Sequence, residues 1–306
     1  MKRKIACSAT LAAGLAAALM AAPPDAGHVP AQMVVTVQSA QKGAPAPQNL
    51  ASGDVTVSED NKPVPVVAFQ RLPADMSDLQ LFIYLDDSTR SASLGVHIPA
   101  LKQFVQSLPA TAQVAIGYMR NGTFALAQPF TTDHQKAAAA IRLPDAIPGE
   151  NGSPYFALSE LAKHWPSKEP GRRAVLMLTD GVDRYYPGSI LDDPYVDAAI
   201  TDCLKNGLQV SSIYLFGSGR YGRGAWTQNF AQSRLMQVTG QTGGYSYFEE
   251  FTDPVDIIPF LQDFQSRLGD QYRVTVAALY RGIQPVKLST ELPGVKVEGP
   301  SRIYAK

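Results

Sequence analysis

Two groups of polar residues could do chemistry, and each follows a short apolar run. Residues 86–90 (Asp-Asp-Ser-Thr-Arg) come directly after Leu79–Leu85, and residues 179–181 (Thr-Asp-Gly) come directly after Ala174–Leu178. Continuous apolar runs of this length are typical of strands that are buried on both faces. Ligands of open α/β sheets bind at the carboxyl ends of the strands, so we expect the two groups to share one crevice.

Paired carboxylates with hydroxyls nearby offer the oxygen ligands that a hard divalent cation such as Mg²⁺ requires. The same residues also have a simpler interpretation, in which each Asp caps the turn that follows its strand and binds nothing. The spacing alone leaves both interpretations open.

The two groups resemble the signature segments of the von Willebrand factor type A (vWA) domain. That family binds Mg²⁺ through Asp-x-Ser-x-Ser after its first strand, a Thr from a middle loop, and an Asp after a later strand. Asp86 and Ser88 match the first two positions, Asp180 matches the last, and Ser153 in Gly-Ser-Pro-Tyr (152–155) takes the place of the Thr. The resemblance implies a degenerate metal-ion-dependent adhesion site of these four residues, with no cofactor or a weakly bound Mg²⁺.

One position departs from the family motif, because Arg90 stands where the third position has Ser. A hydroxyl ligand is lost and a permanent cation is added. Arg90 could point into solvent and leave a weakened metal site. We favour the alternative, in which its guanidinium pairs with Asp86 or Asp180, stands where the metal would, and could hold a partner's carboxylate. The neighbouring acids Asp87 and Asp183 are expected to be exposed.

Further residues that could contact a partner follow the same strand ends. Residues 184–186 (Arg-Tyr-Tyr) come soon after Asp180, and the glycine-rich loop 217–224 follows the apolar run Leu208–Phe216. Tyr and Arg are enriched at binding hot spots, whereas the glycine-rich loop could also be a plain flexible connection. We therefore predict a partner-binding rim that includes Arg184, Tyr185, Tyr186, Arg220, Tyr221 and Arg223.

An α/β domain over residues 79–270 must position these groups. Its apolar runs alternate with segments of helical pattern, which indicates parallel strands joined by helices. The order predicts a vWA-like (Rossmann-like) α/β fold with a mostly parallel sheet and helices on both faces.

The segments on either side of this domain have the pattern of β-strands. Residues 23–78 contain a leader to residue 32 and a hairpin pattern, whose Glu-Asp-Asn-Lys-Pro turn (59–63) is similar to the N-terminal β segment of bacterial VWFA-related proteins. Residues 271–306 contain short strands broken by Pro and Gly. Net charges of −3 and +4 allow residues 23–78 and 271–306 to attract each other, so we expect them to form one small β module.

Residues 1–22 have the composition of a secretory signal peptide. Lys2, Arg3 and Lys4 precede an apolar run that ends in small residues. A membrane anchor is the alternative, but the Ala-rich run is short for a span. We expect cleavage, export to the periplasm or secretion, and no membrane span in the mature chain. Cys203 is the one cysteine left after cleavage, so no internal disulfide is expected.

The 306 residues include 27 basic and 27 acidic ones without a dense basic stretch, which argues against nucleic-acid binding. No Gly-x-Ser-x-Gly elbow and no His pair at metal-ligand spacing is present in the sequence. We therefore predict a non-enzymatic bacterial protein that binds another protein, by interaction or adhesion, through the rim. An envelope assembly scaffold without a rim ligand is the alternative, and a hydrolase is a weaker one.

Overall fold

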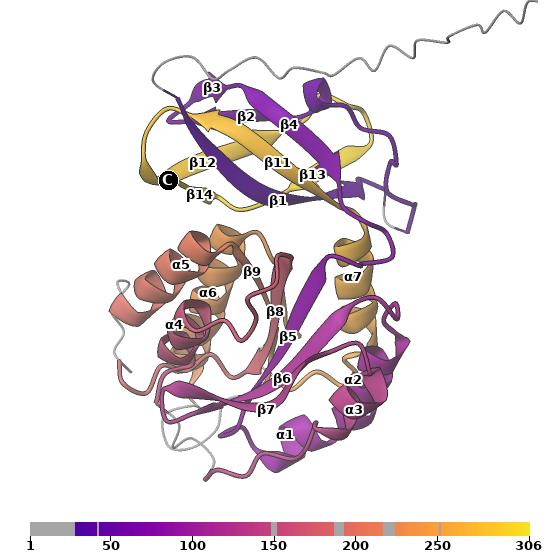
Figure 1. Cartoon of the computed structure of the whole chain (residues 1–306). Helices are drawn as coiled ribbons and strands as arrows, with labels where there is room; N and C mark the ends of the chain where they lie inside the picture. Colours follow the sequence, from indigo (N-terminus) through magenta and orange to yellow (C-terminus); the bar gives the residue numbers. More distant parts are fainter. Residues whose placement is uncertain (1–27, 42, 148–151, 187–192, 217–223, 251) are drawn as a thin grey trace, which may run out of the picture.

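The computed structural model describes residues 28–306 except 42, 148–151, 187–192, 217–223 and 251. The expected signal peptide and the rim residues Arg220, Tyr221 and Arg223 lie outside the described residues. Two sheets lie one above the other in Figure 1, a six-stranded sheet that carries helices and an eight-stranded antiparallel sheet. The coarse prediction of a mixed α/β protein is confirmed.

The six-stranded sheet has the order β10-β9-β8-β5-β6-β7. Its pairings are parallel except that β7 runs antiparallel to β6, so the sheet is mixed. The strands are β5 (Leu79–Asp86), β6 (Gln113–Arg120), β7 (Thr123–Thr131), β8 (Arg172–Thr179), β9 (Leu208–Tyr214) and β10 (Ser246–Tyr247).

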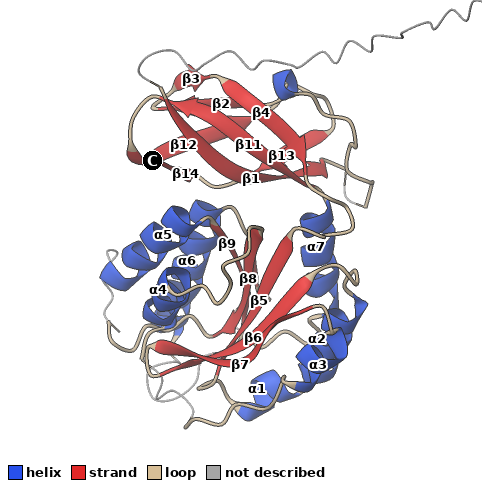
Figure 2. Ribbon diagram, viewed as in Figure 1, coloured by secondary structure: helices blue, strands red, loops and turns tan. Residues whose placement is uncertain are grey.

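Helices cover both faces of this sheet, as predicted (Figure 2). Alternate side chains of β5 explain why: Leu81, Ile83 and Leu85 enter the apolar core on one face, and Phe82 and Tyr84 enter the core on the other. The first core packs against α1 (Ser91–Gly95), α2 (Ile98–Ser107), α3 (His134–Ala139) and α7 (Ile258–Gly269). The second packs against α4 (Pro154–Lys163), α5 (Pro194–Asn206) and α6 (Ala225–Thr242).

The two chain ends form the eight-stranded sheet, which is larger than the small β module that we expected. Its order is β3-β2-β12-β14-β1-β11-β4, and β13 also pairs with β1. The strands are β1 (Val29–Ser39), β2 (Thr56–Glu59), β3 (Lys62–Val64), β4 (Val66–Arg71), β11 (Gln271–Ala278), β12 (Gly282–Ser289), β13 (Val295–Glu298) and β14 (Arg302–Ala305), and a 3₁₀ turn covers Ser52–Asp54.

The expectation that residues up to 32 form a leader is wrong in part, because β1 begins at Val29. Residues 29–32 pair with residues 275–278 of β11, and Val29 and Ala31 are buried. The hairpin expected near residue 60 is present between β2 and β3. Its turn residues Asp60 and Asn61 both have positive φ, which is the conformation that a two-residue hairpin turn requires.

Arg172, the first residue of β8, joins the two sheets. Its buried guanidinium donates to the carbonyl of Leu268 (2.7 Å) and to Oε1 of Gln271 (2.6 Å), just before and at the start of β11. Gln271 in turn donates to Gln209 at the start of β9 (2.6 Å). The amino edge of the six-stranded sheet therefore faces the eight-stranded sheet, and its carboxyl edge lies at the far end (Figure 1).

Within the described part of the chain, no helix is both long and apolar enough to span a membrane.

Two glycines near the end of α6 provide a test of this packing. A Cβ at Gly244 would overlap the backbone carbonyl of Val210 in β9, whereas a Cβ at Gly240 in α6 would meet nothing. We expect Gly244→Ala to lower the free energy of unfolding by about 1–3 kcal/mol through overpacking. The matched control Gly240→Ala should raise it by up to about 1 kcal/mol through helix propensity. Urea denaturation measures both, and equal effects would contradict this packing.

Candidate functional site at the carboxyl edge of the sheet

The structure brings the two predicted groups together. Asp86 ends β5 and Asp180 directly follows β8, and these strands are neighbours with Leu85 paired to Leu178. After β5 the chain continues into β6 on one side, and after β8 it continues into β9 on the other. The two aspartates therefore lie at a topological switch point, which is where open α/β sheets bind their ligands.

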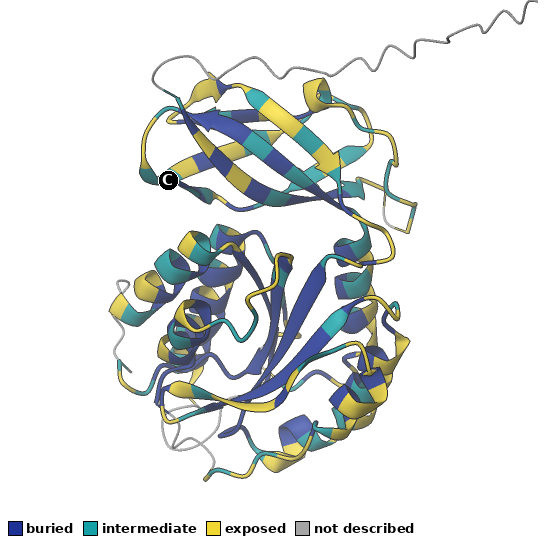
Figure 3. Cartoon of the chain, in the orientation of Figure 1, coloured by how far each residue is buried: buried dark blue, intermediate teal, exposed yellow. Residues whose placement is uncertain are grey.

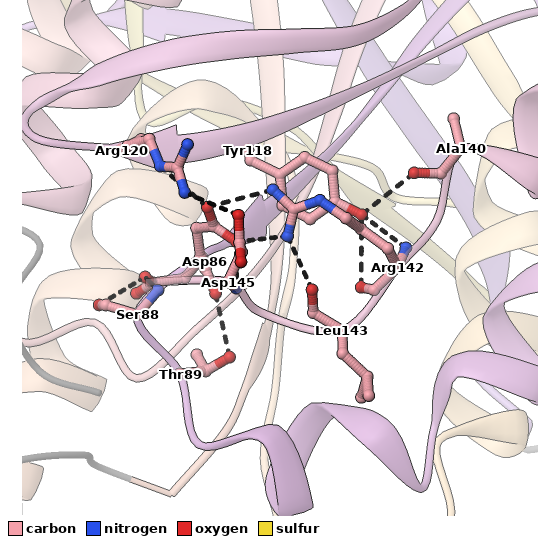
Figure 4. A network of polar contacts seen from close by, with 10 residues as sticks. Asp86, Ser88, Thr89, Tyr118, Arg120, Ala140, Arg142, Leu143 and Asp145 are labelled. Atoms are coloured by element: carbon pink, nitrogen blue, oxygen red, sulfur yellow. Dashed lines mark hydrogen bonds and ion pairs between the residues drawn. The ribbon is translucent and has the colours of Figure 1, made fainter. Parts of the chain in front are cut away.

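Asp86 is fully buried and has a partner for each carboxylate oxygen. Oδ1 accepts from the backbone N–H (2.9 Å) and the hydroxyl (2.8 Å) of Ser88, as Figure 4 shows, and Oδ2 accepts from the hydroxyl of Thr179 (2.8 Å). Burial and the nearby charge of Asp180 raise the pKa of Asp86, while the charge of Arg184 and the bonds from Ser88 act against this rise.

Asp180 forms an ion pair with Arg184. Nη2 of Arg184 lies 2.5 Å from Oδ2 and Nη1 lies 3.3 Å from Oδ1, and both side chains are buried. The chain turns back between them at Gly181, which has a φ of +66°, and the N–H of Val182 donates to Oδ1 (3.0 Å). Arg184 was predicted as part of an exposed rim, but its guanidinium lies inside the site.

The favoured pairing of Arg90 with Asp86 or Asp180 is not formed. In the described part of the chain Arg90 has no ion pair, and the guanidinium beside Asp180 belongs to Arg184. Arg90 is the N-cap residue of α1, and its carbonyl accepts from the N–H groups of Ser93 and Leu94. The backbone of Arg90 therefore begins helix α1, and its guanidinium pairs with neither aspartate.

Ser153 lies at the same edge but does not point its hydroxyl at Asp86. Its Oγ donates to Asp183 (2.5 Å) and accepts from the N–H of Phe156, and it thereby caps α4. Asp183 also accepts from the N–H groups of Tyr185 and Tyr186. The expected exposure of Asp183 is therefore wrong. Burial raises its pKa, and the bond from Ser153 opposes this effect.

Asp87 is also buried, contrary to expectation. Its carboxylate forms an ion pair with Nε of Arg120 (3.2 Å). It also accepts hydrogen bonds from both terminal nitrogens of Arg142 (2.8 and 3.2 Å) and from the backbone N–H of Asp145 (2.9 Å). Part of this network appears in Figure 4. The guanidinium of Arg142 also lies over the ring of Tyr118. Asp87 thus holds the loop after α3 against the carboxyl edge. Sequence reasoning missed these arginines because they come from distant elements.

Exposed aromatic side chains surround the end of this site. Tyr185 is half exposed and packs edge-on against Phe156 and at a tilt against Tyr195, which come from the first turns of α4 and α5. Asp193 caps α5 by accepting from the N–H groups of Tyr195 and Val196. This cap sets the start of α5 and thereby the position of Tyr195 in its first turn.

The six most exposed large apolar side chains of the described residues belong to segments near this edge. Leu143 lies close to Gly95 in α1, and Asp253 ties the segment before α7 to Phe216 after β9 and to Ser93. Figure 3 shows exposed loops at this end below a buried sheet. We call these six side chains the apolar edge: Val96, Leu143, Ile147, Tyr185, Trp226 and Val255.

The four residues matched to the metal motif do not fit Mg²⁺ in this arrangement. The hydroxyls of Ser88 and Ser153 are donated to carboxylates, both oxygens of Asp180 face a guanidinium, and Arg90 supplies no oxygen. Over the described ranges, no three His, Cys, Asp or Glu side chains form a group that could hold a metal ion.

No protein-family model matches the chain, and no curated protein matches it. Solved structures are similar at 11–15% sequence identity. An aerotolerance-related membrane protein from Bacteroides fragilis is 15% identical with a TM-score of 0.43, over 62% of this chain and 98% of that chain. The hypothetical protein BatB from Bacteroides thetaiotaomicron is 14% identical with a TM-score of 0.41, over 62% and 97%. The SpRpn10 VWA domain is 11% identical with a TM-score of 0.39, over 63% and 97%.

The SpRpn10 domain belongs to the family that the Asp86 and Asp180 segments resemble. At these identities the similarity concerns the fold alone.

The buried carboxylate of Asp86 makes stability depend on pH. Because its pKa is raised in the fold, the folded protein binds this proton more tightly than the unfolded chain does. The unfolding free energy of the wild type minus that of Asp86→Asn should therefore fall as the pH rises above about 4, and level off above the raised pKa. Urea denaturation over a pH series measures the difference. A difference that grows with pH would mean that Arg184 outweighs burial and would contradict this assignment.

Proposed function

We propose that this chain is an exported, non-enzymatic protein that binds another protein through the carboxyl edge of its six-stranded sheet. The observation that carries the proposal is the apolar edge. Val255 is 91% exposed and Trp226 is 79% exposed, and the other four members are the next most exposed large apolar side chains described. All six belong to segments near the carboxyl ends of the strands, and exposed apolar surface beside polar residues is a feature of protein interaction sites.

The partner that fits this edge has apolar side chains next to a carboxylate. Arg90 follows Asp86 by one short loop and has no ion pair among the described residues, so its guanidinium is available for a bidentate bond to a carboxylate. Tyr185 adds an aromatic ring, a type enriched at binding hot spots. The predicted signal peptide supports a partner in the periplasm, at the cell surface or outside the cell.

The polar contacts support a role without catalysis. The carboxylates of Asp86, Asp180 and Asp183 are buried, and each accepts several hydrogen bonds from this chain. In addition, Asp180 forms an ion pair with Arg184. In the described residues no His bonds a Ser or Cys side chain, so no activated nucleophile supports the hydrolase alternative. No cofactor is needed for the binding that we propose.

A double substitution at the apolar edge tests the proposal. Trp226→Ser/Val255→Ser removes two exposed side chains that make no contribution to either core, so stability should change little. Affinity for a partner captured from the envelope of the native cells should fall at least about 30-fold, the loss of roughly 2 kcal/mol that hot-spot residues give. Calorimetry with the purified partner measures the change.

The matched control is Tyr280→Ser, which removes a half-exposed ring from the turn between β11 and β12 and should leave affinity unchanged. Equal affinity of all three proteins would contradict binding at the edge and would favour the envelope scaffold. Turnover of generic ester or phosphate substrates, lost in Asp86→Asn, would instead favour the hydrolase.

A further inference from the structure

Two buried carboxyl groups lie close together at the carboxyl edge. Asp86 and Asp180 are 2% and 1% exposed and follow neighbouring strands, and the charge of Asp180 is one cause of the raised pKa of Asp86. Two close carboxylates in a buried crevice repel each other, and either protonation of one or a neighbouring cation relieves this repulsion. The family that these segments resemble uses Mg²⁺ for this purpose.

In this chain the cation is the guanidinium of Arg184. It bonds both oxygens of Asp180, at 2.5 and 3.3 Å, and donates to the carbonyl of Val182 at 3.2 Å. Its side chain is 8% exposed. Burial lowers the pKa of Arg184, but the charges of Asp180, Asp86 and Asp183 raise it by more, so one guanidinium interacts with three acids.

The backbone holds Arg184 in this position from two directions. Gly181 reverses the chain with positive φ, and a Cβ there would crowd Leu235 and the carbonyl of Ala231 in α6. The N–H of Arg184 donates to the carbonyl of Gly152 in the loop before α4 (2.9 Å). The reversal at Gly181 and the backbone hydrogen bond to Gly152 therefore help to position Arg184, in addition to its attraction to the acids.

The hydroxyls of the motif complete the same internal network. Ser88 and Thr179 donate to Asp86, and Ser153 donates to Asp183 while it caps α4. A divalent cation would have to displace Arg184 and also reorient these hydroxyls, since each of them points its proton at a carboxylate.

We propose that Arg184 takes the place of the divalent cation of the family, so that the carboxyl edge is assembled without metal. Arg184 is a positioning residue: it fixes Asp180 and the turn that presents Tyr185. One consequence rests on the proposed function, namely that partner binding is indifferent to chelators. The internal replacement itself does not depend on any partner.

Mn²⁺ titration of the full chain by calorimetry and electron paramagnetic resonance tests the proposal. The wild type should bind no Mn²⁺ at millimolar concentration, and neither EDTA nor Mg²⁺ should shift its melting temperature. Arg184→Ser removes the guanidinium from both oxygens of Asp180 and adds a hydroxyl, so it should bind Mn²⁺ at least about tenfold more tightly than the wild type and melt at a higher temperature with Mg²⁺.

Three variants make the result specific. Arg90→Ser restores the family's third ligand but leaves Arg184 in place, and it should not bind Mn²⁺. Arg184→Ser/Asp180→Asn should lose the Mn²⁺ binding gained by Arg184→Ser. Arg184→Lys keeps a cation beside Asp180, so it should remain without Mn²⁺ binding.

Stoichiometric Mn²⁺ binding by the wild type, or by Arg90→Ser, would overturn the proposal. So would a folded Arg184→Ser that binds no Mn²⁺. Arg184→Ser could fail to fold in the absence of metal. In that case, refolding in the presence of Mn²⁺ but not in the presence of EDTA would support the proposal. Failure to refold in both conditions would overturn it. All these readouts are independent of a partner, so they stand even if the proposed binding function fails.

Discussion

The buried ion pair of Asp180 with Arg184, beside the buried carboxyl group of Asp86, constrains how the carboxyl edge of this protein is built. Asp86 and Asp180 end neighbouring strands of the sheet, where their carboxylates are removed from water. A buried carboxylate without a counter-charge is costly, and breaking such a pair is more destabilising than never forming it. Arg184 therefore constrains the turn after β8, and that turn sets the positions of Asp183 and Tyr185.

The two edges of the six-stranded sheet have opposite roles. At the amino edge Arg172, Gln271 and Gln209 form a buried chain of hydrogen bonds that joins this sheet to the eight-stranded sheet. At the carboxyl edge the carboxylates of Asp86, Asp180 and Asp183 are bonded within the chain, and large apolar side chains of nearby segments are exposed. Among the described residues, the eight-stranded sheet lies at the amino edge and does not cover the carboxyl edge.

The sequence predicted the parts of the site that depend on local order. Asp86 and Asp180 each follow an apolar strand directly, so their meeting follows from parallel pairing alone. The choice of Arg184 over Arg90 could not be predicted, because it depends on the reversal at Gly181 and on the helix that begins after Arg90. The burial of Asp87 was missed because Arg120 and Arg142 come from other elements, and the eight-stranded sheet was underestimated because its pairings join both chain ends.

Packing of the two cores does not account for the most exposed apolar side chains at the carboxyl edge. Both cores lie on the faces of the sheet, where helices cover them, and Trp226 and Val255 contribute to neither. Their exposure carries a solubility cost that a chain of this size could avoid with polar residues. The buried carboxylates beneath them are bonded within the chain, but the partly exposed side chains of Arg120, Arg142 and Asp145 lie at the same edge, so this surface combines apolar and charged groups. Under the proposed function, a partner of this edge therefore needs apolar side chains beside charged ones.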